Sequence, residues 1–391
     1  MTDASHFPFE PIISVGLCDG TPFGLKPVGN YAIEASEEQI SYMPESDNSY
    51  MLVTGMEIGC DFHWQQKLDL RFGGVLNLRR DGDKSQLINI LKVESYLKCV
   101  VGSEMNPEAP VELVKAHAVI SRSWALRQLS RRVGNTSIPH DTDNSDAIIT
   151  WSESDAHKDY NVCADDHCQR YQGLDAVTAA SEAAVVSTRG IVLMDAVSGL
   201  IADARFSKCC GGQTELFSTC WGDIDYPYLK SVKDEFCTPE RLNRYDKKTL
   251  LKDYDRLTDD YFSWKRIVSR QIVKDNLRRY YNRDIGDVID LNPLGRGPSG
   301  RIHTLEVIGS SGRIVIGKEL AIRRLLSDTH LYSSAFDVSA HEDGFLLAGK
   351  GWGHGVGLCQ IGAAVMACEG YTWQEILSHY YPGTNLSKLY E

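Results

Sequence analysis

The sequence predicts an α+β fold, with a mainly antiparallel β-sheet core, several packed helices and a charged helical insertion. Short apolar runs separated by turn residues fill the first part of the chain, a long run without Gly or Pro follows, and hairpin-like alternation returns later. The 391 residues are 42% hydrophobic, which is enough to bury a large core. We expect one domain over residues 10–391, with the helical insertion at residues 238–283.

The N-terminal part, from Ile13 to about Leu97, is expected to be rich in β-strands. Its apolar segments are short and alternate with turn residues, a spacing typical of hairpins. These segments are ISVGL, YMLVTGM, GVLNLRR and LINILKV.

Residues 110–129 predict a helix that begins with Pro110, at a position where helices tolerate proline. Apolar residues recur on opposite faces of this helix, so we expect it to be buried on most sides. Lys115 and Arg122 lie within the pattern and would need partners. We name both as candidate substrate-binding residues.

The rest of the chain predicts further helices and strands. The segment AVTAASEAAVVSTRGIVLM indicates a helix that runs into a strand, and GPSGRIHTLEVIGSSGRIVIG indicates a hairpin with SSG at its turn, followed by a helix at ELAIRRLL. Residues 238–283 are highly charged with apolar residues at helical spacing, which is the pattern of a helical insertion or lid.

Composition restricts the classes of partner. A formal net charge of −12 argues against nucleic acid as the main partner, because phosphate binding needs a basic face. No apolar run reaches about 18 residues, so no membrane span is expected. The N-terminus, MTDASHFPFEPIISVGLCDG, lacks the pattern of a signal peptide, so the chain as written is expected to stay in the cytoplasm. Eleven cysteines lean slightly toward a reducing compartment.

Glu104 is the first candidate catalytic residue. It closes the apolar run CVVGS and precedes a proline-containing loop, so we expect it at the end of a strand. A carboxyl group next to apolar residues can hold its proton and act as a general acid. A surface or helix-capping glutamate would explain the same spacing.

A glycine-rich segment near the C-terminus, GWGHGVGLCQIGA, predicts a shaped loop. Glycine costs stability inside a strand or helix, so Gly353, Gly355 and Gly357 at alternate positions indicate unusual backbone angles or a close approach.

These motifs resemble the SpoIID/LytB family of sporulation and cell-wall proteins. The resemblance lies in INILKVESYLKCVVGSEM with the following PVELVKAHAVISRSWAL, and in GWGHGVGLCQIGA with its closing YYPGT. The segments GGQTELF, YPYLKSV, SGRIHTLEVIG and IRRLL fall between them in family order. The resemblance covers nearly the whole chain except the charged insertion.

The resemblance implies a peptidoglycan lytic transglycosylase. Such enzymes cut glycan strands between N-acetylmuramic acid and N-acetylglucosamine and leave 1,6-anhydro ends, and Glu104 is the residue carried over as acid and base. Glycan strands or muropeptides would be the substrate, and a cell-wall amidase is a possible partner because some family members are described as amidase enhancers.

The same resemblance suggests substrate contacts near the C-terminus. His354 and Gln360 would donate hydrogen bonds to sugar hydroxyl or acetamido groups, although a structural turn around a buried histidine would also explain the loop. Tyr380 and Tyr381 would offer a flat face to a sugar or would pack in the core.

The chain departs from the family pattern at a few positions. His117 stands where glutamine is usual, Leu358 and Cys359 replace Met-Ser, and the vicinal Cys209 and Cys210 stand where small hydroxyl residues are common. These departures leave the substrate choice open.

A candidate zinc site lies within twelve positions of the chain. His157, Cys163, His167 and Cys168 offer imidazole and thiolate ligands that suit tetrahedral zinc, and four protein ligands would make the site structural. Buried thiols beside exposed histidines would give the same pattern. Some SpoIID members carry a zinc site of two His and two Cys in this region.

Two other functions remain open. A non-catalytic glycan-binding protein that modulates a separate amidase would use the same groove. A zinc hydrolase is less favoured because the cluster leaves no open coordination position. An extracytoplasmic location would require that a leader had been removed.

Overall fold

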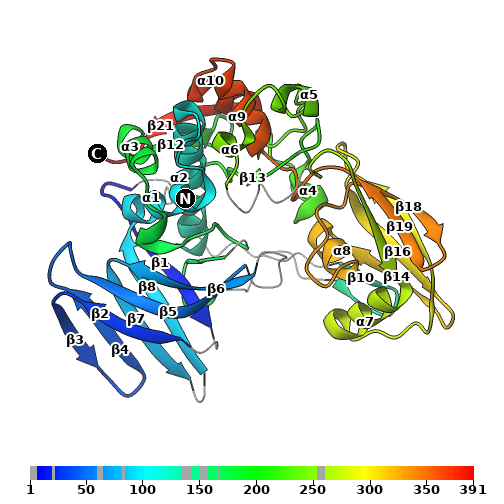
Figure 1. Ribbon diagram of the computed structural model, residues 1–391, viewed down its shortest axis with the longest axis horizontal. Helices are drawn as coiled ribbons and strands as arrows, with labels where there is room; N and C mark the ends of the chain where they lie inside the picture. Colours follow the sequence, from blue (N-terminus) through cyan, green and yellow to red (C-terminus); the bar gives the residue numbers. More distant parts are fainter. Residues whose placement is uncertain are drawn as a thin grey trace. The chain divides into compact units, whose positions relative to one another are not determined.

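The chain folds into two compact units, each built from separate stretches of sequence (Figure 1). The computed structural model describes residues 7–19, 23–59, 65–81, 84–133, 142–149, 157–165, 167–252 and 260–391. The first unit contains Met1–Thr136, His157–Asp203 and Thr384–Glu391, and the second contains Ser137–Ala156 and Ala204–Gly383. Both mix helices with antiparallel sheets, so the predicted α+β class is confirmed.

The first unit begins with eight strands in two sheets, as the hairpin-like spacing predicted. A six-stranded sheet has the order β11-β1-β8-β7-β4-β3, and a three-stranded sheet has the order β2-β5-β6. All pairs are antiparallel except β1 with β11. The strands are β1 (Ile12–Asp19), β2 (Gly24–Val28), β3 (Tyr31–Ala35), β4 (Gln39–Pro44), β5 (Tyr50–Ile58), β6 (Gln66–Phe72), β7 (Val75–Asp81), β8 (Lys84–Lys92) and β11 (Val162–Cys163).

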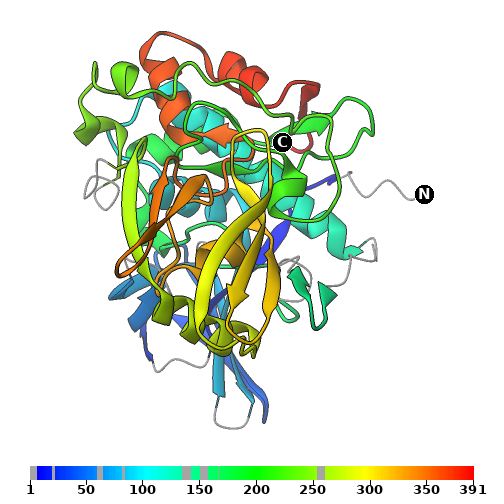
Figure 2. The same ribbon diagram turned by 90° about the vertical axis from the view of Figure 1, so that its right-hand side faces the viewer.

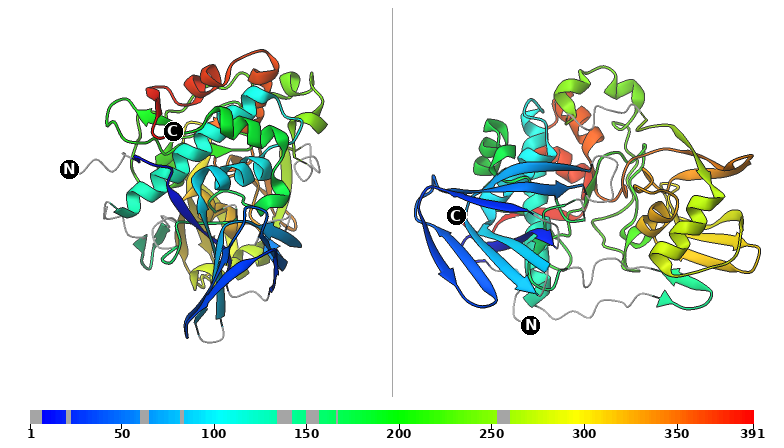
Figure 3. Two further views of the ribbon diagram at one scale, coloured as in Figure 1. Left: turned by 90° about the vertical axis from the view of Figure 1, so that its left-hand side faces the viewer. Right: turned by 60° about the horizontal axis from the view of Figure 1, so that its bottom comes forward.

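Helices follow the strands of the first unit directly (Figure 3, left panel). They are α1 (Val93–Glu104), α2 (Val111–Val133), the 3-10 turn η1 (Gly173–Ala176) and α3 (Ala179–Ser187). Helix α2 packs against α1, α3 and strand β12 (Ile191–Asp195), which accounts for its burial on most sides. The C-terminal strand β21 (Thr384–Lys388) pairs with β12 and so completes this unit.

The second unit holds a five-stranded sheet, β15-β16-β17-β10-β9, and a three-stranded sheet, β14-β19-β18 (Figure 2). The two sheets share an apolar core. Its strands are β9 (Thr142–Asp143), β10 (Ala147–Ile149), β13 (Phe206–Ser207), β14 (Trp264–Ser269), β15 (Val288–Arg296), β16 (Ile302–Gly309), β17 (Arg313–Gly317), β18 (Phe336–His341), β19 (Gly344–Gly349) and β20 (Leu358–Cys359). Its helices are α4 (Phe217–Cys220), α5 (Pro239–Leu242), α6 (Lys247–Leu250), α7 (Arg270–Tyr281), α8 (Glu319–Leu325), α9 (Gln360–Cys368) and α10 (Trp373–Tyr380).

Most predicted elements are confirmed, with one change that bears on the site. Strands β16 and β17 form the predicted hairpin, and α3 runs into β12 as expected. The expected β-structure up to Leu97 was wrong beyond Lys92, because residues 93–104 form α1. The charged segment 238–283 contains α5, α6 and α7 but also strand β14.

Within the described part of the chain, none of the helices combines the length and the apolar character that a bilayer crossing requires.

Candidate functional site

Glu104 is the last residue of helix α1, not the end of a strand as the sequence suggested. Its side chain is 8% exposed, and its Oε1 accepts a hydrogen bond of 3.2 Å from the backbone N–H of Arg170. The helix ends directly afterwards because Met105 adopts an extended conformation. Glu104 is therefore a buried carboxyl group with its orientation set by a backbone donor.

The turn of α1 that carries Glu104 lies against the backbone of η1. A Cβ atom on Gly102 would overlap the carbonyl oxygen of Ala176, so only glycine permits this approach. The neighbouring Ser103 Oγ donates to Cys99 O and accepts from Gln172 N at 3.0 Å. The side chains of Ser103 and Glu104, which are adjacent on α1, thus both accept hydrogen bonds from backbone N–H groups of the segment 170–176.

The four predicted zinc ligands come together at the surface of the first unit. One ligand atom from each of His157, Cys163, His167 and Cys168 lies within 4.8 Å of the others. His157 Nε2 is 3.2 Å from both His167 Nδ1 and Cys168 Sγ. His167 Nδ1 is 3.5 Å from Cys168 Sγ, so the two adjacent residues both turn to the same point.

The chemistry of this cluster fits a zinc ion. Hydrogen bonding with Cys168 first, and then His157 and His167, lowers the pKa of the Cys163 thiol to about 2 against the opposite effect of burial. A thiolate is the form of cysteine that binds metals. Two imidazoles and two thiols that converge in this way match the ligand set of closed tetrahedral zinc sites.

The metal cluster and Glu104 share one segment of chain. Arg170, the backbone donor to Glu104, follows the cluster residue Cys168 by two positions. Tyr96 lies beside both, since its hydroxyl donates to Gln169 Oε1 at 3.1 Å in the same segment. The backbone donor to Glu104 thus lies two residues from the cluster.

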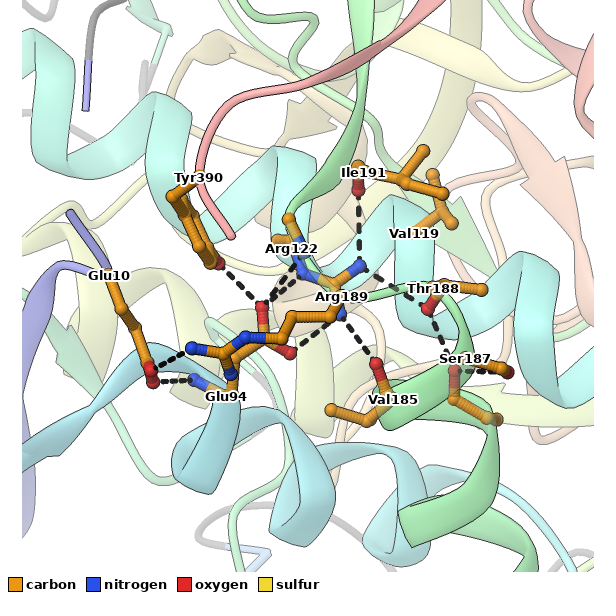
Figure 4. A network of polar contacts seen from close by, with 12 residues as sticks. Glu10, Glu94, Val119, Arg122, Val185, Ser187, Thr188, Arg189, Ile191 and Tyr390 are labelled. Atoms are coloured by element: carbon orange, nitrogen blue, oxygen red, sulfur yellow. Dashed lines mark hydrogen bonds and ion pairs between the residues drawn. The ribbon is translucent and has the colours of Figure 1, made fainter. Parts of the chain in front are cut away.

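Arg122 occupies a different environment from the one expected of a substrate-binding residue. It is fully buried, and its guanidinium forms two hydrogen bonds of 2.8 Å with the carboxylate of Glu94 on α1 (Figure 4). Tyr390 donates to the same carboxylate at 2.6 Å. Arg122 also donates to the carbonyl of Ile191 at 3.1 Å. These contacts give Arg122 a structural role that joins α1, α2 and the C-terminus.

The Glu94 carboxylate stays ionised in this network. Burial would raise its pKa, but the hydrogen bonds and charge of Arg122, with the bonds from Tyr390 and the Gly190 N–H, lower the pKa overall. Lys115, the other candidate on α2, pairs with Glu112 at 2.9 Å and is partly exposed. A substrate contact for Lys115 stays a prediction.

The predicted glycine loop belongs to the second unit and has the shape that its sequence indicated. Gly351, Gly353, Gly355 and Gly357 have φ values of 79°, 83°, 77° and 70°, a region that other residues avoid. The loop folds around the buried guanidinium of Arg301, which donates to Gly353 O at 3.0 Å. A Cβ atom on Gly351 or Gly355 would meet the Arg301 guanidinium, and one on Gly357 would meet Arg205 O, so packing accounts for these three glycines.

His354 is half-buried within this loop. Its Nδ1 accepts a hydrogen bond of 3.0 Å from Val356 N–H, and its ring meets Trp221 edge-on at 4.8 Å between centroids. Burial, and then the positive charges of Arg205, Arg301 and Arg323, lower the pKa of His354 well below its ordinary value. His354 is therefore a neutral imidazole whose ring is fixed by its own loop.

The remaining predicted contact residues also lie in the second unit. Gln360 begins helix α9 and is 5% exposed. Tyr380 and Tyr381 are both buried, with their hydroxyls donating to Asp234 Oδ2 at 2.8 Å and to Arg205 O at 2.5 Å. The two tyrosines pack in the core, which is the alternative that the sequence left open. Contacts of sugar with His354 and Gln360 stay predictions.

The sequence analysis missed two buried polar groups of the second unit. The first is Glu215, whose Oε2 accepts from Ser299 Oγ at 2.5 Å, while that hydroxyl also accepts from Arg301 at 2.9 Å. The second is a cluster formed by Cys210, Asp234, Cys237 and Cys359. Two of these cysteines were noted as departures from a family pattern, but their proximity to Asp234 and Cys237 is visible only in three dimensions.

Two family models match this chain, one mostly within the first unit and one within the second. Residues 81–194 match the family model described as "Stage II sporulation protein", SpoIID, and residues 215–357 match a model described as a domain of unknown function, DUF8618. The SpoIID match contains Glu104 and the whole first metal cluster. Residues 81–194 therefore form a SpoIID-family domain, and the family indicated by the sequence motifs is confirmed.

Particular relatives extend the similarity beyond that domain. Stage II sporulation protein D of Bacillus subtilis is 25% identical over 311 residues, which cover 78% of this chain and 77% of the relative. An uncharacterized protein of Brachyspira hyodysenteriae is 26% identical over 317 residues, covering 81% and 72% of the two chains. The amidase enhancer of Bacillus subtilis is 25% identical over 315 residues, covering 74% of this chain but 40% of the relative.

Proposed function

We propose that this protein acts on the bacterial cell wall as a peptidoglycan lytic transglycosylase, with Glu104 as its catalytic acid and base. The SpoIID-family domain and the similarity to an amidase enhancer support a role connected with the cell wall. The observation that carries the finer proposal is the Glu104 carboxyl group, buried at the end of α1 and held by the Arg170 N–H.

One carboxyl group is sufficient for the proposed reaction. Protonated Glu104 donates its proton to the glycosidic oxygen between N-acetylmuramic acid and N-acetylglucosamine as that bond breaks. The resulting carboxylate removes the proton from the C6 hydroxyl of the muramic residue, whose oxygen then bonds to the anomeric carbon. The products are a 1,6-anhydro end and a free N-acetylglucosamine end, and Glu104 regains its proton. Hydrolytic glycosidases, in contrast, usually need a second carboxylate for water or for a covalent intermediate.

The predicted zinc ligands would help to position Glu104 and would not take part in the reaction themselves. His157, Cys163, His167 and Cys168 would hold a zinc ion, which supplies a rigid cross-link and, with four protein ligands, no open position for a substrate. The segment that it cross-links includes the Arg170 N–H, the donor to Glu104. A constrained segment keeps that donor in place and so limits the rotation of the carboxyl group.

The decisive experiment compares products of the wild type with those of Glu104→Gln. Purified protein is incubated with glycan strands that carry or lack stem peptides, and the products are analysed by mass spectrometry. We expect 1,6-anhydro ends from the wild type and a loss of turnover of at least about 10²-fold in Glu104→Gln, because the amide cannot transfer the proton. The two strand preparations also reveal whether stem peptides are tolerated.

Glu108→Gln is the matched control, because Glu108 lies four positions further on and is exposed. It should keep wild-type turnover. Reducing ends in place of anhydro ends would show that water attacks, and the single-carboxylate reaction would then be wrong. Equal turnover in the Glu104 and Glu108 variants would remove Glu104 from the reaction.

The rival function is a glycan-binding protein that modulates an amidase, and the relative named amidase enhancer favours it. Such a protein would release no anhydro product from either strand preparation. It would bind glycan strands with the same affinity in wild type and Glu104→Gln, and it would change the rate of an added cell-wall amidase.

A further inference from the structure

A second cluster of metal-binding groups lies in the interior of the second unit. One ligand atom from each of Cys210, Asp234, Cys237 and Cys359 lies within 4.8 Å of the others, and all four residues are buried. They come from three segments that are distant in the sequence. Cys210 follows β13, Asp234 and Cys237 precede α5, and Cys359 ends β20.

The four ligand atoms lie close enough together to surround one ion. Cys210 Sγ is 3.3 Å from Asp234 Oδ2. A tetrahedral zinc ion with a Zn–S bond of about 2.3 Å and a Zn–O bond of about 2.0 Å places the sulfur and the oxygen roughly 3.5 Å apart. A buried carboxylate such as that of Asp234 is costly without a partner charge, and soft thiolates with an oxygen ligand favour zinc over magnesium or calcium.

Neighbouring groups hold the ligand atoms in place. Cys359 Sγ accepts from the backbone N–H groups of Cys210 at 3.3 Å and Gly362 at 3.4 Å. Such N–H donors stabilise the charge of a thiolate ligand.

The carboxylate ligand is oriented in the same way. Asp234 Oδ1 accepts from the N–H groups of Phe236 and Cys237 at 3.1 Å, and Oδ2 accepts from the Tyr380 hydroxyl at 2.8 Å. Supporting donors of this kind are the second layer of interactions found around protein metal sites. They also explain why Tyr380 is buried with its hydroxyl directed inward.

We propose that Cys210, Asp234, Cys237 and Cys359 bind a structural zinc ion, separate from the one predicted at His157, Cys163, His167 and Cys168. The two sites belong to different units of the chain. The second ion fastens the end of the glycine loop, at Cys359, to the segments around Cys210 and Asp234. It stabilises the second unit as a cross-link between three distant segments, whatever reaction the protein performs.

A disulfide is the competing chemistry for these cysteines. Cys209 Sγ lies 3.5 Å from Cys237 Sγ, whereas a disulfide bond is about 2.05 Å long. Oxidation of this pair would remove two electrons and two protons and would take Cys237 away from the ion. The experiment must therefore distinguish bound zinc from a sulfur–sulfur bond.

The test is the zinc content of protein purified without chelator and with a thiol reductant, measured by inductively coupled plasma mass spectrometry. We expect two zinc ions per chain in the wild type. Cys163→Ser/Cys168→Ser should keep one ion, Cys237→Ser/Cys359→Ser should keep the other, and the fourfold variant should keep none. Cys368→Ser is the control and should keep two, because Cys368 lies on α9 outside the cluster.

Asp234→Asn keeps the test valid if the cysteine variants fail to fold. Asparagine has nearly the same shape and retains an acceptor oxygen, so the fold should persist, as circular dichroism can show. We expect at least a tenfold weaker hold on one of the two zinc ions in competition with a chromogenic chelator, and no change in the other. Three outcomes would overturn the proposal: two zinc ions retained in Cys237→Ser/Cys359→Ser, unaltered zinc binding in Asp234→Asn, or a disulfide mapped to Cys237 in the reduced wild type.

Discussion

At the scale of the residue, the ion pair of Glu94 and Arg122 shows how the chain uses charge inside its core. The pair is buried, its hydrogen bonds of 2.8 Å are bidentate, and Tyr390 supplies a third donor to the carboxylate. A buried pair gains little over well-packed apolar residues, but the loss of one partner leaves a charge without compensation.

Arg122→Met should therefore destabilise the first unit by about 3–5 kcal/mol, measured by chemical denaturation. Arg189→Met is the control. Arg189 pairs with Glu10 at 2.6 Å but is 38% exposed, so its loss should cost less than about 1 kcal/mol. Equal effects of the two substitutions would contradict the central role of the buried pair.

The unfolding free energy of Arg122→Met should also depend on pH differently from that of the wild type. The pKa of Glu94 is lowered in the folded protein, so its contribution to stability is complete above its ordinary value of 4.5 and is lost as the pH falls toward the folded value. The wild type should lose this contribution below about pH 5. Arg122→Met lacks it at every pH, so the difference in unfolding free energy between the two proteins should shrink on acidification.

Arg122 also shows what local sequence can and cannot predict. The wheel pattern of α2 indicated burial and the need for a partner, and both are confirmed. The partners were hidden because Glu94 lies 28 positions away and Tyr390 lies 296 positions from Glu94. Because the sequence does not show these partners, Arg122 was named as a candidate substrate-binding residue, a role that its burial does not favour.

At the scale of the element, helix α1 was the main error of the sequence analysis. Its segment ESYLKCVVGSE contains adjacent valines, which favour a strand, and a glycine, which disfavours a helix. A short apolar run does not distinguish a buried strand from a buried helix. Tertiary packing decides: α1 lies between α2, α3 and η1, so nearly all of its residues are covered. Helical geometry then places Glu104 at the C-terminal end of α1.

Gly102→Ala tests whether the contact of α1 with η1 positions Glu104. The added methyl group would overlap Ala176 O, which belongs to rigid backbone, so α1 must shift. We expect a loss of stability of about 1–3 kcal/mol, as for other overpacked sites, and a fall in any turnover that depends on Glu104. Gly312→Ala is the control, since Gly312 lies in the turn between β16 and β17 with open space around its Cβ position.

The two groups of candidate metal ligands differ in whether the sequence could reveal them. All four groups of the first fall within twelve positions, so their spacing alone suggested a shared ion. The groups of the second stretch from Cys210 to Cys359; the pairing of β13 with β20 and the hydrogen bond from Asp234 N–H to Gly212 O bring their segments together. Cys210 and Cys359 were noted as unusual in the sequence, but their proximity depends on contacts between distant segments.

At the scale of the whole molecule, the first unit is assembled from three stretches of chain, of which the last is Thr384–Glu391. Strand β21 pairs with β12 over five residue pairs, and Tyr390 reaches Glu94 beyond it. The second unit is complete without these residues.

Truncation after Gly383 should therefore weaken one unit selectively. Hydrogen exchange followed by mass spectrometry should show faster exchange in β12, α1 and α2, because β21 and the hydroxyl of Tyr390 are missing. Strands β15, β16 and β17 should exchange as in the intact chain. Uniform acceleration in both units would show that they unfold together, contrary to this expectation.

The late position of β21 also determines when the first unit can reach its final state. A ribosome releases the N-terminal sheets and α1 long before Thr384 leaves the exit tunnel, and the second unit emerges in the interval. Domains generally fold as they are made, and closing a loop of nearly the full chain length carries an entropic cost that slows the final step. Newly made Glu94 and Arg122 must therefore wait for Tyr390, the last of the donors to the Glu94 carboxylate to leave the tunnel.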